Sequence, residues 1–402
     1  MKRRSLLAAA ILPLAVPAVR GAWAQAPGVT ATELKIGHIV SYSGPASAYG
    51  VIGKTLVAYM RMVNDQGGIA GRRINFITLD DGYVPARAVE AARKLVEQEE
   101  VSFLLNPLGT PSNSAIQKYM NIKKVPQLFV ATGADKWGNP KEFPWTMGWQ
   151  PSYRTEAQIY AKYINANLPD ARVAVIYQND DFGKDYLAGL RDVFGDKHNA
   201  RVIKTVSYEV TDATIDSQAV TLRASGADVL VTAATPKFAA QMIRKVFDLG
   251  WKPAHFLTNV SISVASVMEP AGAEKGVGII SAAYNKDAGD PAWAKDPGMM
   301  EWRAFMAKYI PDGDLNDTNY VFGYGVGVTA MQVLRQCNGD FSRENIMRQA
   351  ASLKDLVIPT HISGIKVNTS PTNFHPIQQM QLMKWSGRAW ELFGNVIEGS
   401  AI

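Results

Sequence analysis

Short apolar runs rich in β-branched residues alternate with longer amphipathic stretches along most of this sequence. This alternation restricts the fold more than any other feature, because continuous apolar strands separated by helices are typical of parallel sheets covered by helices on both faces. In the stretch 49–68 the apolar residues recur on one helical face: Ile52, Leu56, Met60 and Val63. Strand-like runs occur at "ELKIGHIV" (33–40), "RINFITLDD" (73–81), "VSFLLNPL" (101–108) and "VPQLFVATG" (125–133).

A second series of strand-like runs follows, and irregular stretches rich in Pro, Gly and aromatic residues interrupt the pattern. The second series is "ARVAVIYQND" (171–180), "ADVLVTAAT" (227–235), "AHFLTN" (254–259) and "GVGIISAAY" (276–284). The irregular stretches are 144–153, 284–298 and 356–364, and the last of them precedes a β-like tail at 378–393. Three crossings between two α/β lobes is the simplest arrangement that uses all three breaks.

The first 24 residues have the pattern of an export signal. A basic start at Lys2, Arg3 and Arg4 precedes an apolar stretch that ends in Ala22-Trp23-Ala24, an A-x-A cleavage site. Cleavage after Ala26 is the alternative, but proline would then follow the cut, so we expect cleavage near Ala24. The stretch is short and broken by prolines, which disfavours a retained membrane anchor. The arginine pair leaves a twin-arginine export route open beside the general one.

Charge and cysteine content argue against a nucleic-acid-binding protein and against a disulfide-stabilised fold. Removal of the signal takes away four basic residues, so the formal charge falls from +6 to +2. A chain near neutrality without a dense basic run gives no case for a nucleic-acid partner. The single cysteine, Cys337, cannot form an intramolecular disulfide. The roughly 375 remaining residues suffice for a large core and suggest two domains. We expect an exported, periplasmic monomer.

The loop "SYSGPASAYG" (41–50) leaves an expected strand and enters an expected helix, as phosphate-binding loops do. It has neither the G-x-x-x-x-G-K-[ST] nor the G-x-G-x-x-G spacing, and Pro45 removes one backbone donor. A phosphate site is therefore disfavoured. The positive end of the following helix dipole still suits a carboxylate.

Catalytic and metal-binding signatures are missing from the sequence. There is no G-x-S-x-G elbow, no H-E-x-x-H and no cysteine pair. The five histidines are scattered, and we interpret each as a surface or hydrogen-bonded residue rather than a metal ligand. The acid pairs Asp80-Asp81 and Asp180-Asp181 end strands, where acids often cap a following helix. The prediction is a protein that is not an enzyme and needs neither cofactor nor metal.

Several motifs in their order resemble the Leu/Ile/Val-binding family of extracytoplasmic solute-binding proteins. They are "SGPASAYG" (43–50), "NDQGGIAGRRI" (64–74), "TLDDGYVPARAV" (78–89), "NDDFGKDYLAGL" (179–190) and "FDLGWKPAHFLTN" (247–259). The resemblance covers about residues 33–395. It implies two α/β lobes, each a mostly parallel sheet flanked by helices, joined by a three-segment hinge of the type I periplasmic-binding fold. By the same resemblance, we expect the lobes to close on a small molecule and deliver it to an ABC importer, whose permease subunits provide the only membrane contact.

The resemblance also implies lobe boundaries and ligand-contacting positions. Lobe 1 is expected to comprise 27–148 and 285–358, and lobe 2 to comprise 149–284 and 359–402. Tyr49 matches an aromatic against the ligand, and Thr110 a hydroxyl for the ligand carboxylate. The expected binding positions are Tyr49, Gly109, Thr110, Ala131, Thr132, Gly133, Trp149, Phe182, Thr235 and Val260.

The ligand class depends on a departure from the family pattern. Val260 stands where amino-acid binders carry the acid that pairs with the ligand's α-ammonium, and no acid follows until Glu269. An unpaired buried ammonium costs several kcal/mol, so we expect a small carboxylate without an α-amine, and the aromatic residues Trp145, Trp149 and Tyr153 favour a ring. The alternative is an aliphatic amino-acid binder with a displaced ammonium partner. The family's early disulfide is also missing, with Tyr83 and Gly109 at its positions.

Two other classes remain as alternatives. An exported α/β enzyme requires a catalytic dyad in the cleft, and turnover of a bound ligand would identify it. A ligand sensor for a membrane receptor requires a signalling domain on this chain or on a partner. Neighbouring genes distinguish the two binding roles, with permeases and ATPases indicating transport and a kinase indicating sensing.

Overall fold

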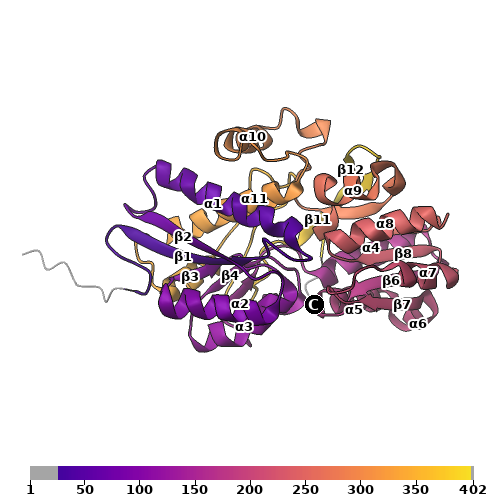
Figure 1. Cartoon of the computed structure of the whole chain (residues 1–402), viewed down its shortest axis with the longest axis horizontal. Helices are drawn as coiled ribbons and strands as arrows, with labels where there is room; N and C mark the ends of the chain where they lie inside the picture. Colours follow the sequence, from indigo (N-terminus) through magenta and orange to yellow (C-terminus); the bar gives the residue numbers. More distant parts are fainter. Residues whose placement is uncertain (1–25, 400–402) are drawn as a thin grey trace, which may run out of the picture.

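The computed structural model describes residues 26–399, which form two α/β halves, each built on its own sheet (Figure 1). The expected export signal, residues 1–24, lies outside the described residues. Both sheets are mostly parallel and flanked by helices, which confirms the fold class expected from the alternating pattern. Within the described part of the chain, no helix is both long and apolar enough to cross a membrane.

The first sheet has the strand order β2-β1-β3-β4-β5, and all of its pairs are parallel. Its central strands are buried on both faces, as their continuous apolar sequences predict; β3 and β4 have no exposed residue. The strands are β1 (Glu33–Val40), β2 (Arg73–Asp80), β3 (Phe103–Leu105), β4 (Gln127–Val130) and β5 (Thr146–Gly148).

Helices from two distant parts of the chain pack around this sheet. The early ones are α1 (Gly50–Asp65), α2 (Pro85–Arg93) and α3 (Thr110–Ile122); the late ones are α10 (Pro297–Tyr309), α11 (Thr318–Gln336) and α12 (Arg343–Ala350). Helices α1 and α11 lie side by side (Figure 1). Glycine permits this approach, because a Cβ on Gly323 would lie 2.7 Å from Thr55 and one on Gly327 would lie 2.7 Å from the Tyr59 ring.

The second sheet has the order β12-β11-β10-β9-β8-β6-β7. Strands β6 to β10 are mutually parallel, whereas β11 is antiparallel to β10 and β12 is antiparallel to β11. The β-like tail of the sequence is this final hairpin. The strands are β6 (Val173–Gln178), β7 (Val202–Tyr208), β8 (Val229–Ala233), β9 (Ala254–Leu257), β10 (Ile280–Ala283), β11 (Gln379–Trp385) and β12 (Trp390–Glu398).

The helices of the second half include two that border the space between the halves, α4 and α5. The helices are α4 (Tyr153–Asn167), α5 (Asp181–Phe194), α6 (His198–Arg201), α7 (Asp216–Ala224), α8 (Pro236–Asp248) and α9 (Glu269–Ala271). The chain passes between the two halves three times: between β5 and α4, between β10 and α10, and between α12 and β11.

The two acid pairs at strand ends differ in what they do. Asp180 caps α5 by accepting a hydrogen bond from the Gly183 amide, as expected. Asp80 and Asp81 do not cap a helix, so that expectation is wrong for this pair: α2 begins after Val84 without a side-chain cap. Asp80 instead accepts the amides of Tyr42, Ser43 and Gly82. The Asp81 carboxylate accepts the hydroxyls of Ser41 and Ser112, so both acids order the loops around β1 and β2.

Candidate functional site

A cavity lies between the two halves, and residues from both line it. It comprises about 860 Å³ not filled by protein atoms, part of it open to solvent. Most of the lining residues follow the carboxyl ends of strands in both sheets, where open α/β sheets bind ligands, and α1, α11 and β11 contribute the others. Seven of the ten expected binding positions line this cavity: Tyr49, Gly109, Thr110, Ala131, Phe182, Thr235 and Val260.

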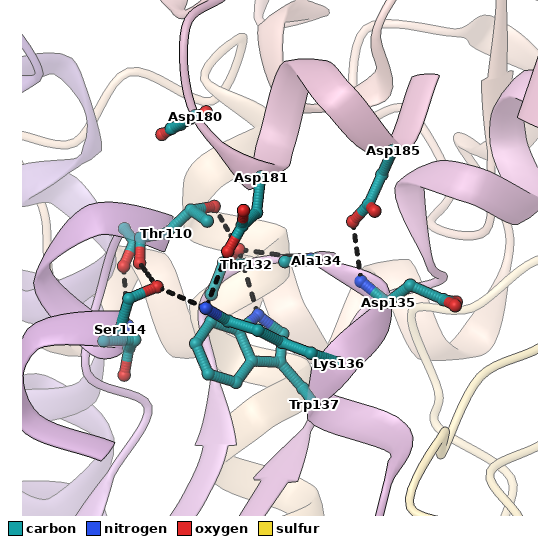
Figure 2. A network of polar contacts seen from close by, with 12 residues as sticks. Thr110, Ser114, Thr132, Ala134, Asp135, Lys136, Trp137, Asp180, Asp181 and Asp185 are labelled. Carbon is teal, nitrogen blue, oxygen red and sulfur yellow. Dashed lines mark hydrogen bonds and ion pairs between the residues drawn. The ribbon is translucent and has the colours of Figure 1, made fainter. Parts of the chain in front are cut away.

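The first half presents Thr110 to the cavity at the first residue of α3. Gly109 precedes it with φ of 92°, and a Cβ there would lie 2.5 Å from the Tyr83 ring, so only glycine allows this turn. The hydroxyls of Thr110 and Thr132 lie 2.6 Å apart (Figure 2). The Thr132 oxygen also accepts the N–H groups of Ala134 and Trp137, each at 3.3 Å, and either threonine hydroxyl can be the donor in the bond between them. The Thr110 hydroxyl lines the cavity beside the positive end of the α3 dipole, and it has a proton for a ligand when Thr132 is the donor of the pair.

The second half contributes Phe182 near the start of α5, Thr235 as the N-cap of α8, and Val260 in the short 3₁₀ helix 259–261. Tyr208 lies behind Thr235: its hydroxyl accepts the Thr235 amide at 2.9 Å and donates to Gln178 at 3.1 Å. These bonds hold the start of α8 in place at the cavity wall.

Aromatic side chains form much of the cavity wall, on both halves: Tyr49, Tyr83, Tyr153, Phe182, Tyr284 and Phe322. The rings of Tyr153 and Phe182 are in contact, with centroids 4.5 Å apart. Burial raises the pKa of Tyr49, Tyr83 and Tyr153, so these phenols stay neutral and act as hydrogen-bond donors or acceptors. Tyr83 was not among the expected binding positions, because the family resemblance marks it only as the place of a missing cysteine.

Three expected positions lie outside the cavity lining. Trp149 is buried between Phe129 and His361, with ring centroids 5.6 and 5.9 Å away. Thr132 lies behind Thr110. The Gly133 carbonyl accepts the Tyr153 amide at 2.7 Å, and a Cβ on Gly133 would lie 2.5 Å from a backbone oxygen. These three residues support the wall rather than form it.

His361, behind Trp149, differs from the interpretation of the histidines as surface or hydrogen-bonded residues. It is buried, and neither ring nitrogen has a hydrogen-bond partner within residues 26–399. Burial lowers the pKa of His361 to about 3, so it is neutral and packs as an aromatic ring. The other two buried histidines are hydrogen-bonded, as expected. His38 bonds to the Leu105 carbonyl and His255 bonds to the Thr232 hydroxyl.

Polar contacts join the two halves at the edge of the cavity (Figure 2). Lys136, in the 3₁₀ helix Asp135–Gly138, donates to Ser114 of α3 and to Asp181 of α5, each at 2.7 Å. The Asp135 amide donates to Asp185 of α5 at 2.7 Å. Burial raises the pKa of Asp185 to about 7 and that of Asp180 to about 6. The halves are thus closed against each other.

A buried glutamate lies next to the cavity without lining it. Glu156 of α4 is fully buried, and its carboxylate accepts bonds from the Asn259 amide, at 2.8 Å, from the Asn259 side chain and from Tyr160. Burial raises the pKa of Glu156 to about 7. The sequence carries no signal for this role, because an acid in the first turn after the Ser152 cap is ordinary at a helix start.

The charged residues of the lining are Lys286 and Asp287. Lys286 is paired with Asp296 at 2.8 Å and also donates to the Pro359 carbonyl at 2.8 Å. Asp287 accepts the amides of Gly289 and Trp390, and burial raises its pKa. Glu269 and Asp181, the other acids near the Val260 region or the cleft, do not line the cavity. Among residues 26–399, no group of three or more His, Cys, Asp or Glu is placed to hold a metal ion.

The chain is similar to known proteins over nearly its whole length. Residues 33–389 match the family model described as "Periplasmic binding protein". The chain is 22% identical over 389 residues to Leu/Ile/Val-binding protein homolog 7 of Brucella abortus, covering 93% of this chain and 94% of that protein.

Solved structures share the fold. A branched-chain amino acid ABC transporter protein from Thermus thermophilus with bound valine superposes with a TM-score of 0.82 at 15% identity, covering 92% of this chain and 97% of that one. An ABC transporter solute-binding protein from R. palustris in complex with 4-hydroxybenzoate gives a TM-score of 0.75 at 18% identity, covering 91% of this chain and 97% of that one.

Proposed function

Because the chain belongs to the periplasmic binding protein family, we propose that it captures a small carboxylate lacking an α-amine between its two halves and delivers it to an ABC importer. In this role the chain binds and releases its ligand without turnover, as an exported periplasmic monomer. Its other partner is the importer's permease.

The position of Thr110 is the observation that supports a carboxylate on the ligand. Its hydroxyl lines the cavity, shares one hydrogen bond with the Thr132 hydroxyl, and lies at the positive end of the α3 dipole. A carboxylate is the ligand group that such a donor set suits best, because hydrogen bonds to a charged acceptor are about twice as strong as neutral ones.

The aromatic wall supports a ring or another flat apolar body on the ligand. Tyr49, Tyr153 and Phe182 line the cavity from different elements, so an apolar ligand contacts ring surfaces on both halves. The R. palustris structure contains an aromatic acid in the same fold, which shows that the fold accommodates such a ligand.

The second candidate is an amino acid with a displaced ammonium partner. Val260 lines the cavity, so the place of the family's acid is apolar, but the Asp287 carboxylate also lies in the lining. Asp287 already accepts two backbone amides, which reduces its capacity for an ammonium. We therefore favour the plain acid, although relatives bear names that refer to Leu, Ile and Val.

A thermal-shift screen with matched acids and α-amino acids tests the proposal. Ligand at a hundred times Kd stabilises the folded state by about 2.7 kcal/mol, so a true ligand raises Tm visibly. We expect 3-phenylpropionate to stabilise the protein far more than phenylalanine, and Val260→Glu to weaken the plain acid. Stabilisation by leucine, valine or phenylalanine that Asp287→Asn abolishes would support the second candidate instead.

A further inference from the structure

Asn259 and Glu156 form a polar pair at the wall of the cavity. Asn259 lines the cavity, whereas Glu156 lies behind it and is fully buried. The two residues are joined twice, by the backbone amide and by the side-chain Nδ2 of Asn259, which donate to different carboxylate oxygens of Glu156. This double contact fixes both the position and the rotation of the Asn259 side chain.

The charge state of Glu156 determines which end of the Asn259 amide faces it. An ionised carboxylate has no proton to donate, so only the Nδ2 end can bond to it. The Tyr160 hydroxyl also contacts Glu156, and it lies 2.7 Å from the Leu257 carbonyl, which accepts the Ser281 hydroxyl as well. In the part of the chain that the structure describes, the Oδ1 atom of Asn259 makes no hydrogen bond and is not among the fully buried polar atoms, which fits the position of Asn259 at the cavity.

We propose that Glu156 is a positioning residue that holds Asn259 with Oδ1 as a hydrogen-bond acceptor at the cavity, so that the site selects carboxylates that also carry a hydroxyl group. This inference rests on the proposed function and adds the second polar feature of the ligand. Thr110 on the first half takes the carboxylate, and Asn259 on the second half takes the hydroxyl proton.

A hydroxyl fits this acceptor better than an ammonium does. A hydroxyl has one proton to donate, and one neutral acceptor satisfies it. An ammonium has three protons and a full charge, and its burial against a single amide oxygen leaves much of its desolvation cost uncompensated. The adjacent Val260 adds no polar side chain.

Glu156 can also reverse the amide. Burial raises the pKa of Glu156 to about 7, so acidification below this value adds a proton that can be donated to Oδ1. The titratable side chains that act on Glu156 are tyrosines: Tyr153 and Tyr160 of α4, Tyr186 of α5, and Tyr284 after β10. Burial raises the pKa of each of them, so Glu156 is the group among them that changes charge between pH 5 and 8.

Calorimetric titration of the full mature chain with matched acid pairs tests the inference. The pairs are benzoate with 4-hydroxybenzoate and 3-phenylpropionate with 3-phenyllactate. We expect the hydroxyl to improve affinity roughly two- to tenfold at pH 8 in at least one pair, the value of one neutral hydrogen bond. The advantage should fall at pH 5.5 in the unmodified protein, without any mutation.

Glu156→Gln separates positioning from structural support. The glutamine amide can donate to Oδ1 of Asn259, so the hydroxyl advantage and its pH dependence should both disappear while the plain acid still binds. Tyr160→Phe is the matched control, because it removes the hydroxyl that contacts Glu156 and the Leu257 carbonyl and leaves the bonds between Glu156 and Asn259; it should lower stability but keep the hydroxyl advantage.

The outcomes distinguish this inference from the proposed function. If the acids bind but the hydroxyl gives no advantage, or if Glu156→Gln retains a pH-dependent advantage, the inference is wrong and the proposed function stands. If no acid of either pair binds the unmodified protein, the proposed function fails and the inference fails with it.

Discussion

The Tyr49 hydroxyl donates to the main-chain carbonyl of Val260 at 2.9 Å, joining residues 211 positions apart in the sequence. Tyr49 precedes α1 in the first half and Val260 follows β9 in the second, so this bond spans the cavity. Both residues also line it. Such a bond stabilises the closed arrangement without contacting the ligand. A ligand that binds the closed form therefore binds with higher affinity, because that form is more populated.

Tyr49→Phe removes this bond and keeps the ring. We expect ligand affinity to fall roughly two- to tenfold, because one neutral hydrogen bond contributes about 0.5–1.5 kcal/mol, while the free energy of unfolding changes little. Calorimetry measures the affinity. Tyr42→Phe is the control, since among the described residues the Tyr42 hydroxyl bonds to Thr78, within the first half. Equal losses in the two variants would exclude a specific role in closure.

The Lys136–Asp181 pair makes a smaller, salt-sensitive contribution to closure (Figure 2). The side chains are 33% and 46% exposed, and ion pairs of this exposure contribute about 0–1 kcal/mol. Lys136→Met should weaken binding by about fivefold or less at low salt, and the difference should vanish at high salt. Lys366→Met serves as control, because Lys366 pairs with Asp355 away from the cavity. A loss that persists at high salt would contradict a screened ion pair.

Thr110→Val tests the carboxylate contact. The variant keeps the side-chain shape but leaves a charged acceptor without one donor, so affinity for the acid should fall roughly ten- to a hundredfold. Thermal unfolding without ligand should change by less, and Thr329→Val provides a buried control whose hydroxyl donates to the Gly325 carbonyl of its own helix. Unchanged affinity would remove Thr110 from the site.

Glu156 makes stability depend on pH in a defined window. Burial raises the pKa of Glu156 from 4.5 to about 7. The contribution of the protonated carboxyl to the free energy of unfolding is therefore complete below about pH 4.5 and is lost as the pH rises through about 7. The unmodified protein should therefore lose unfolding free energy relative to Glu156→Gln between these values. Urea unfolding at pH 4.5, 6 and 8 measures the difference, in which the contributions of Asp180 and Asp185 cancel. A difference that grows in the opposite direction contradicts a pKa of Glu156 that is raised by burial.

The sheets were predictable because their signal is local. Each central strand is a continuous apolar run, and the runs alternate with helical stretches, so their parallel pairing follows from the sequence. Even the exceptional antiparallel hairpin of β11 and β12 lies in the stretch that looks β-like. The prediction for Asp80 and Asp81 was wrong because an acid that caps a helix and an acid that bonds to a neighbouring loop have the same local sequence.

The site was predictable only in part, because much of it depends on contacts between distant residues. Tyr49 and Thr110 follow strand ends and carry a family resemblance. Glu156 meets Asn259 across 103 positions of sequence, and no local pattern connects them. Tyr83 enters the cavity wall from a turn at φ of 63°, an uncommon conformation for a side chain of its size that the sequence does not signal.

Calorimetric titration with an aromatic acid and its primary amide tests the central claim most directly, because the two ligands share shape and differ in charge. The account predicts that the acid binds the unmodified protein, that the amide binds at least tenfold more weakly, and that Thr110→Val reduces this difference. Equal binding of acid and amide would contradict capture of a carboxylate at the start of α3.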